Sequence, residues 1–478
     1  MWRNQWKQTK VYQNSCSSPE KNFDDRIIRR FYFSATKDVN IRHDQSKLIS
    51  DLKTVIFNTR HATHSLESIE KSFLNRVKRA EGSELLVSAQ ALSRLRRESG
   101  GIVDPRLSFP ILQRLDELVD TFDRTDVIQL IQFMSLSVNR RKVLLGDSSA
   151  ATIDAMCENI VSKCCQRLHR KLEDLPISSL SVLVSSLSRR RTVVTDGFFQ
   201  EVSLTVMSHM DLCVSRKETP ASAIIREDLQ RALPYIWIAF KQIQFEPEPS
   251  FTDSSLKLFS LFLDKVPFTY LTLFVEGLAG NPNKDILVDS RFRNILDYCE
   301  ESLSASPDDF LIADTCRLFN SQLGIRSLDM RIMTLLEGSA TTRSSAEWTV
   351  HVLVEVAEIL SRSNLSECRQ LCNRFESEFR KQSAAIPPTY SSQIFRSLLA
   401  SDLNPEVKEL AKSLVNKHMK RLTPTELFPI IESVDSLESF QRKGYSAVSR
   451  NACRQLKKFL SSMKEEDRRR FKRLCQTS

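Results

Sequence analysis

Leu172-Glu-Asp-Leu-Pro-Ile-Ser-Ser-Leu-Ser-Val-Leu-Val-Ser-Ser-Leu187 aligns without a gap with Leu263-Asp-Lys-Val-Pro-Phe-Thr-Tyr-Leu-Thr-Leu-Phe-Val-Glu-Gly-Leu278. Both stretches have apolar residues at positions 1, 4, 9, 12, 13 and 16 and proline at position 5. Positions 9, 12, 13 and 16 share one face of an α-helix, because they are spaced i, i+3, i+4 and i+7. Each stretch therefore predicts a helix that buries one side.

The pattern recurs along the chain. Val119–Met134 and Met419–Val434 follow it, and looser copies begin at Val77 and Ala221, the first departing at position 12, Ser88. The starts at 77, 119, 172, 221 and 263 are spaced by 42, 53, 49 and 42 residues. The next clear start, at 419, lies 156 residues further on, which leaves room for three or four units.

A second amphipathic helix is predicted after each of the clearer copies. Examples are Ile153–Leu168, Phe198–Met210 and Phe292–Leu303. One such hairpin of about 40–50 residues cannot bury its apolar side alone, whereas stacked hairpins can. We therefore predict an all-α fold, an α-solenoid of helical hairpins, with a regular array over 38–300 and degenerate repeats over 301–440.

Positions 5 to 8 of the pattern contain residues that start helices. Proline suits the first turn of a helix, and Ser, Thr or Asp can accept a hydrogen bond from its free amides. An apolar residue at position 4 can pack onto that first turn. Residues of these kinds are Pro176, Pro267, Ser178, Ser179, Thr269, Thr125, Asp126, Thr423 and Thr425.

The composition agrees with packed helices. Only 10 of the 478 residues are glycine, whereas loop-rich β folds and α/β enzymes need more of them. No window approaches 18 uninterrupted apolar residues, so no transmembrane helix is predicted. The most apolar stretch, Leu256–Leu278, predicts two buried helices that meet at a turn.

Positive charge is concentrated at the two ends. Of the formal net charge of +10, residues 1–37 carry eight Lys/Arg against three acids, and 441–478 carry twelve against three. The remainder, 38–440, is therefore −4. We predict a basic targeting segment or disordered tail over 1–37 and a basic, amphipathic C-terminal helix over 441–478.

The N-terminal segment is typical of a mitochondrial address. Met1–Lys10 is basic and amphipathic, and Arg29-Arg30-Phe31-Tyr32-Phe33-Ser34 resembles sites where presequences are cleaved. Glu20, Asp24 and Asp25 depart from the usual shortage of acids. We predict a mitochondrial location, with a disordered basic tail on a cytoplasmic protein as the alternative.

The repeat motif Leu-x-x-Leu-Pro-x-Ser-x-Leu-x-x-Leu-Val-x-x-Leu, with Ser88–Leu95 and Ser186–Arg189 at helix ends, has a counterpart in a known group. It resembles organellar helical-repeat RNA-binding proteins of the octotricopeptide and heptatricopeptide type, including the repeat region of FAST-kinase-like proteins. The resemblance covers residues 70–300 and, weakly, 400–440. It implies binding of organellar RNA, or a place in a mitochondrial ribosome or RNA-processing complex. The α/β RAP module that often ends such proteins is not recognisable, which removes any hint of nuclease activity.

Basic residues follow the first helix of every copy, at positions 18 to 25. Equivalent positions of a solenoid share one edge, so these residues predict a positive stripe that contacts RNA phosphates. The alternative is that Lys and Arg stabilise helix C-termini through the helix dipole. The stripe comprises Arg94, Arg96, Arg97, Arg140, Arg141, Lys142, Arg189, Arg190, Arg191, Lys241, Lys284, Arg442 and Lys443.

The C-terminal segment adds a second predicted RNA-binding group: Lys457, Lys458, Arg468, Arg469 and Arg470. Interleaved with apolar residues, these cations predict a helix that could lie on ribosomal RNA, an anionic membrane or an acidic partner. The alternative is a solvated terminal helix. No pair of polar residues recurs at fixed repeat positions, so sequence-specific base reading is not predicted.

No catalytic motif is present in the sequence. It lacks GxGxxG, GxxxxGK[ST], HExxH and GxSxG, and His61 and His64 have no third metal ligand at an obvious spacing. The 11 cysteines lack a C-x-x-C pair, and we predict reduced, buried thiols rather than a disulfide framework. We therefore predict a non-enzymatic protein without cofactor or metal.

Two functions remain open at this stage. The first is an organellar RNA-associated solenoid whose basic edge contacts RNA phosphates and whose partners include other proteins of a large complex. The second is a protein–protein scaffold without direct RNA contact, which holds partner helices on its concave face. A continuous positive edge would favour the first function, and a groove of mixed charge would favour the second.

Overall fold

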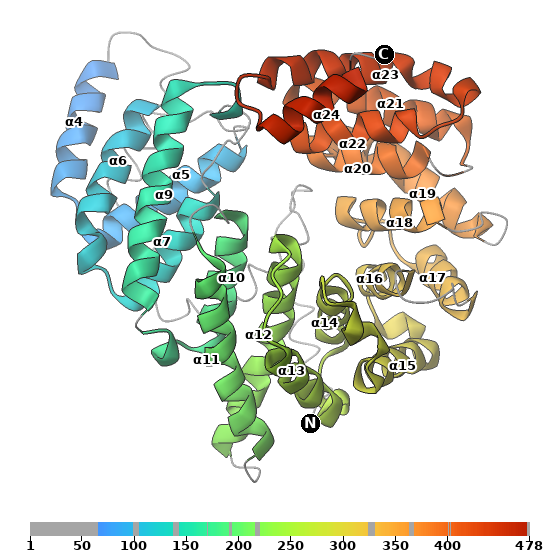
Figure 1. Cartoon of the computed structure of the whole chain (residues 1–478), viewed down its shortest axis with the longest axis horizontal. Coiled ribbons are helices and arrows are strands. Elements are labelled where there is room, and N and C mark those ends of the chain that lie inside the picture. Colours follow the sequence, from blue (N-terminus) through green and yellow to red (C-terminus); the bar gives the residue numbers. More distant parts are fainter. Residues whose placement is uncertain are drawn as a thin grey trace.

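The structure is a computed structural model. It describes residues 66–98, 105–136, 143–169, 171–190, 194–215, 220–323, 330–362, 368–399, 401 and 403–475. Within these ranges the regular elements are α-helices and 3-10 helices, with no strand (Figure 1). The predicted all-α class is confirmed. The predicted address over 1–37 lies outside the described residues.

The helices form two concentric rows. The inner row consists of α5 (Gly82–Glu98), α7 (Arg124–Leu136), α10 (Ile177–Leu187), α12 (Pro220–Ile243), α14 (Phe268–Ala279), α16 (Ile312–Leu323), α18 (Val350–Arg362), α20 (Pro388–Leu399) and α22 (Pro424–Asp435). The outer row consists of α4 (Leu66–Arg79), α6 (Pro105–Leu118), α9 (Ser148–His169), α11 (Asp196–Ser215), α13 (Pro249–Leu261), α15 (Ser290–Ala305), α17 (Met330–Thr342), α19 (Arg369–Gln382), α21 (Pro405–His418) and α23 (Ser439–Leu456). Each inner helix packs against the next inner helix, so the predicted α-solenoid is confirmed.

A short 3-10 turn precedes the inner helix in each of the four clear copies of the repeat. The turns are η1 (Val119–Thr121), η2 (Leu172–Asp174), η4 (Leu263–Lys265) and η9 (Met419–Arg421), and they occupy positions 1 to 3. The apolar residue at position 4 then adopts an extended conformation and is buried, as at Leu175 and Val266. Proline at position 5 favours this, because it disfavours a helical conformation in the residue before it.

Position 5 is the N-cap of the inner helix, so the predicted cap Thr423 is confirmed, whereas the candidates at positions 6 to 8 lie inside the helix. Asp123 accepts a hydrogen bond from the backbone of Asp126 at 2.8 Å, and Thr423 forms a capping box with Glu426. The residue at position 7 of one copy, Thr269, does not cap its own helix but donates to Asp314 on the next inner helix at 2.7 Å. The Thr269 hydroxyl therefore links two neighbouring repeats and does not cap the helix that contains it.

The structure also shows where the repeat units between 263 and 419 begin. Turns η6 (Pro307–Asp309) and η8 (Ser383–Ala385) precede α16 and α20, and buried Trp348 stands at position 4 before α18. Three units therefore start at 307, 345 and 383. The units that start at 307 and 383 are difficult to recognise in the sequence, because Thr315 and Ser391 occupy the normally apolar position 9.

The apolar stripes of the rows merge into two buried cores. One extends from Phe73 to Leu318 and the other from Ile312 to Met463, so the two cores adjoin at α16. The looser copy at Ala221 differs in form, because α12 is one unbroken helix from Pro220 without a preceding 3-10 turn. Its stripe is nevertheless buried.

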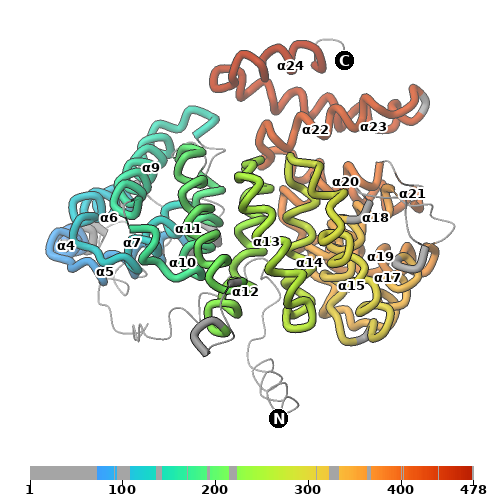
Figure 2. The backbone as a smooth tube through the Cα atoms, turned by 60° about the horizontal axis from the view of Figure 1, so that its bottom comes forward, coloured from blue at the N-terminus to red at the C-terminus, as the bar shows by residue number. Residues whose placement is uncertain are grey.

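The C-terminal segment forms two helices rather than the single helix predicted over 441–478. After α23 and a short 3-10 turn, the chain reverses and forms α24 (Glu465–Cys475), which packs on α22 and α23 (Figure 2). Phe459 and Met463 are buried at the reversal. Glu465, Glu466 and Asp467 form the first turn of α24, where the helix dipole favours acids, so the charge pattern starts a new helix there.

Gly277 lies where α14 crosses α12 closely. A Cβ atom at Gly277 would come within 2.6 Å of the Trp237 Cβ and 2.9 Å of the Trp237 backbone carbon. We therefore expect Gly277→Ala to force the two helices apart and to lower the free energy of unfolding by about 1–3 kcal/mol, measured by urea denaturation.

Gly338, inside α17, provides the matched control. A Cβ atom there would meet nothing within 4 Å. Gly338→Ala should be neutral or stabilise by about 0.5–1 kcal/mol, because alanine favours helix. Equal effects of the two substitutions would contradict this account of the close crossing.

Candidate functional site

The concave side of the solenoid contains a cavity of about 640 Å³, here called the central groove. Side chains from α10, α12, α14, α16, α18, α20 and α22 line it, so it runs along most of the inner row. Its size is within the range of ligand-binding clefts in proteins.

Repeat position decides which side chains reach the central groove. Position 14 contributes Ser185, Glu276, Glu358 and Arg396 from four different units. Position 11 of the unit that starts at 307 contributes Arg317. Because the residue type at each position changes from unit to unit, the groove does not offer the repeated polar pair that reads successive RNA bases.

The charge of the central groove is mixed. Its cations are Arg189, Arg317, Arg362 and Arg396, and its acids are Glu276, Glu355 and Glu358. Several are paired with one another, and Arg362 binds Glu358 on the same helix. The acids lower the positive potential that a phosphate backbone would need along the groove.

A buried ionic network joins the inner helices at the floor of the groove. Arg317 contacts Asp314 at 2.7 Å and Glu276 at 3.0 Å, and Glu276 contacts Lys241 at 2.9 Å. Asp314 and Arg317 side chains are at most 4% exposed. The network ties α12, α14 and α16 together. Its buried pair, Asp314 and Arg317, needs both charges to be stable, whereas Lys241 and Glu276 remain partly exposed.

The pKa values of two carboxyl groups in this region shift in opposite directions. Burial raises the pKa of Glu276, but Lys241 and Arg317 more than offset it, so the pKa lies below its usual value. For Glu355, burial dominates and raises the pKa, although the neighbouring His351 opposes it. Glu355 is thus the acid of the groove most easily neutralised.

The predicted basic stripe is only partly described, and part of it has structural contacts. The side chains of Arg94, Arg96 and Arg97 and the residues Arg140, Arg141, Lys142 and Arg191 lie outside the described parts of the chain. Arg189 lines the central groove, half-buried. Arg190 is 3% exposed, so the prediction that it contacts RNA does not fit its position: it pairs with Asp154 and donates to the Met134 carbonyl.

Other members of the stripe contact helix C-termini, as in the alternative based on the helix dipole. Lys284 donates to the Asn281 carbonyl at 3.0 Å, just after α14. Arg442 donates to the Leu437 carbonyl at 3.1 Å, just after α22, and Lys241 is held by Glu276. Lys443 is exposed.

Three cations of the central groove, Arg317, Arg362 and Arg396, are not among the predicted residues. Arg362 occupies position 18 of the unit that starts at 345, the position of Arg189 in its own unit. Arg396 occupies position 14 of the unit that starts at 383. The unit that starts at 345 could have been recognised in the sequence from Trp348 and the apolar stripe of α18.

Exposed positive charge gathers instead on the last two helices, on what we call the C-terminal basic surface. Between Ser439 and Cys475, only Glu465 and Glu466 are exposed acids. The surface consists of the exposed side chains of Arg442, Lys443, Arg450, Arg454, Lys457, Lys458, Lys464, Arg468, Arg469, Lys472 and Arg473. Four of the five RNA-binding cations predicted in the C-terminal segment belong to this surface: Lys457, Lys458, Arg468 and Arg469.

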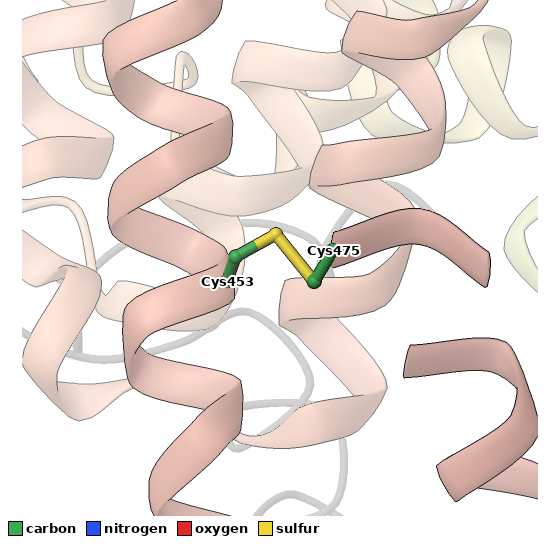
Figure 3. The surroundings of a disulfide bond; sticks show 2 residues. All are labelled: Cys453 and Cys475. Carbon is green, nitrogen blue, oxygen red and sulfur yellow. A yellow bond between two sulfur atoms is a disulfide. The ribbon is translucent and has the colours of Figure 1, made fainter. Parts of the chain in front are cut away.

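The fifth predicted cation, Arg470, is half-buried and anchors α24. Its guanidinium contacts both carboxylate oxygens of Glu432 on α22, at 2.6 and 2.7 Å, and stacks 4.7 Å from the centre of the Phe428 ring. A disulfide between Cys453 and Cys475 also joins α23 to α24 (Figure 3). These contacts fix the position of the C-terminal basic surface on the solenoid.

The disulfide departs from the prediction of reduced thiols, which the other described cysteines fit. Eight described cysteines outside the disulfide are buried, among them Cys164, Cys165, Cys368 and Cys372. Burial raises the pKa of Cys165 and of Cys372 to about 12, so these thiols are protonated and poorly nucleophilic at neutral pH. Among the residues that the structure describes, no cluster of His, Cys, Asp and Glu could hold a metal, and no helix is long and apolar enough to span a membrane.

Known proteins add no assignment. No model of a known protein family matches the chain, and a search of curated proteins finds no match.

The buried pair of Asp314 and Arg317 gives a test of the network. Arg317→Met should leave Asp314 buried without its cation and lower the free energy of unfolding by about 3–5 kcal/mol in urea denaturation. The double variant Asp314→Asn/Arg317→Met removes both charges and should recover most of that loss, because Thr269 can still donate to Asn at 314. A double variant as unstable as the single one would contradict the charge pairing.

Proposed function

We propose that this chain is a non-catalytic α-solenoid that contacts RNA phosphates through its C-terminal basic surface, as a component of a mitochondrial ribosome or RNA-processing complex. The observation that carries the proposal is the excess of eleven exposed cations over two exposed acids on α23, α24 and the turn between them. Such an excess suits a phosphate backbone, which attracts cations regardless of base sequence.

The fixed position of this surface also supports the proposal. Arg470 and the disulfide hold α24 in place, and Arg468 donates to the Leu460 carbonyl at 3.1 Å, close to Lys457 and Lys458 in the chain. Cations that are already placed lose less conformational entropy on binding than cations on a flexible tail. Contacts to phosphate position a protein on RNA without reading its sequence.

The mitochondrial setting rests on the predicted address over 1–37 and on the resemblance to organellar repeat proteins. The surrounding complex would supply the protein partners that the long solenoid can accommodate.

Charge reversal at Lys457 and Lys458 tests the RNA proposal. Both side chains are exposed. Lys457→Glu/Lys458→Glu should weaken binding to an RNA hairpin and to poly(U) about equally, by tenfold or more in fluorescence anisotropy at low salt. The slope of log affinity against log salt should also become shallower, by roughly 0.7–0.9 for each phosphate that the variant no longer neutralises.

The matched control reverses two exposed cations on the convex side, Lys257 on α13 and Arg293 on α15. Lys257→Glu/Arg293→Glu makes the same change in net charge and should leave RNA affinity within about twofold. Equal losses in the two double variants would point to non-specific attraction, and no RNA binding by the unaltered protein would reject the proposal.

The mixed charge of the central groove favours a second candidate function, a scaffold that holds a segment of a partner protein. Polypeptides carry both signs of charge, so they can pair with Arg189 and Arg396 and also with Glu358. RNA phosphates could pair with the two arginines but would be repelled by the glutamate. This candidate and the first one use different surfaces, so both can operate in one complex.

A photo-crosslinking residue at position 393 tests the second candidate, because Gln393 is exposed and lines the central groove. Crosslinks from the native compartment should fall on one recurrent protein segment and be lost on Arg396→Glu. A crosslinker placed at Lys257 on the convex side should not give that segment. Crosslinks to RNA, or to many unrelated proteins, would count against a scaffold role for the groove.

A further inference from the structure

The C-terminal hairpin of the solenoid touches the segment that precedes α9, two hairpins from the start of the described helices. The Ser462 hydroxyl, between α23 and α24, donates to the Leu144 carbonyl, just before α9, at 2.6 Å. These residues are 318 positions apart in the chain. Figure 1 shows the start of α9 beside the C-terminal helices, so the rows of helices curve into a nearly closed ring.

The contact also joins the two cores a second time. Leu144 precedes α9, whose buried residues belong to the first core, yet its side chain packs against the second core. The cores therefore adjoin at α16 through continuous packing and again at this contact. We call the second junction the seam, formed by Leu144 on one side and by Ser462 on the other.

Among the described residues, the seam buries little apolar surface compared with the interfaces between neighbouring inner helices. Leu145, Ser461 and Ser462 are exposed, and Leu144 is only half-buried. Neighbouring inner helices, in contrast, bury complete rows of Leu, Ile, Val and Phe between them. Regions with few buried apolar contacts and exposed hydrogen bonds open first in native proteins. A solenoid can follow such an opening by small changes at each repeat interface, because each repeat contacts only its neighbours.

We propose that the seam is a latch, which opens the ring to admit a segment of a partner polypeptide to the central groove and then closes around it. The groove is lined by α10 through α22, so its inner helices lie within the arc that the seam completes. The role as an entrance rests on the proposed scaffold function of the groove. The opening itself is a property of the protein alone.

Single-molecule energy transfer across the seam tests the opening. Dyes are attached through Leu145→Cys and Ser461→Cys in a Cys16→Ser background, since the eight other cysteines outside the disulfide are buried. We expect a dominant high-transfer population in exchange with a minor low-transfer one. In the same labelled protein, Leu144→Ala/Ser462→Ala should raise the ratio of open to closed molecules at least fivefold.

Ser436 supplies the control, because it is an exposed serine in the same unit whose hydroxyl bonds locally to the Ser433 carbonyl. Ser436→Ala should leave the populations unchanged, and thermal unfolding should be the same in all variants. A single high-transfer population that Leu144→Ala/Ser462→Ala does not alter would overturn the latch.

Access to the groove is measured separately with a Gln393→Cys variant in the Cys16→Ser background. The rate of its reaction with a 5 kDa polyethylene glycol maleimide should rise several-fold when Leu144→Ala/Ser462→Ala is added, while the rate with N-ethylmaleimide stays the same. An unchanged polymer rate would overturn the entrance role. Neither experiment contains RNA or a partner protein, so failure of the latch is distinguishable from failure of the proposed functions.

Discussion

The apolar face of each inner helix has to be covered by the next repeat, and the whole structure follows from that requirement. Positions 9, 12, 13 and 16 place Leu180, Leu183, Val184 and Leu187 on one side of α10, where all four are buried. A single hairpin offers no surface that covers such a face, so hairpins stack and the stack extends as a solenoid. The concave side of the inner row, which no other described helix of the stack covers, lines the central groove.

Stacking also determines which polar residues the groove can contain. Positions 11 and 14 lie beside the buried stripe, and in several units they line the central groove. Where a charge at these positions is pressed between helices, it needs a partner: Arg317 lies between Glu276 of the preceding unit and Asp314 of its own. Buried charges are stable only in such pairs. The pairing leaves the groove with both signs of charge, which suits a polypeptide better than a polyanion.

Many of the exposed cations of the solenoid lie on its last two helices. Three predicted cations have structural partners instead: Arg190 pairs with Asp154, Lys241 pairs with Glu276, and Lys284 donates to a carbonyl at the end of α14. The exposed cations of α23 and α24 outnumber the exposed acids there, although Arg468 and Arg469 both pair with Glu465. A disulfide and the Arg470–Glu432 pair hold the two helices in place. The same hairpin supplies Ser462 to the seam, which places the C-terminal basic surface next to the junction that closes the ring.

The sequence by itself determined the fold class, the hairpin unit and the clear inner helices, because an apolar stripe of helical period is a local pattern that survives in one stretch of chain. It also indicated most of the basic side chains of α24. Only the tertiary structure decided which cations are exposed, since Arg190 and Arg470 have the same local appearance as their neighbours but meet Asp154 and Glu432 from distant segments. The seam was equally hidden, because a contact across 318 residues depends on the summed curvature of every repeat between its ends.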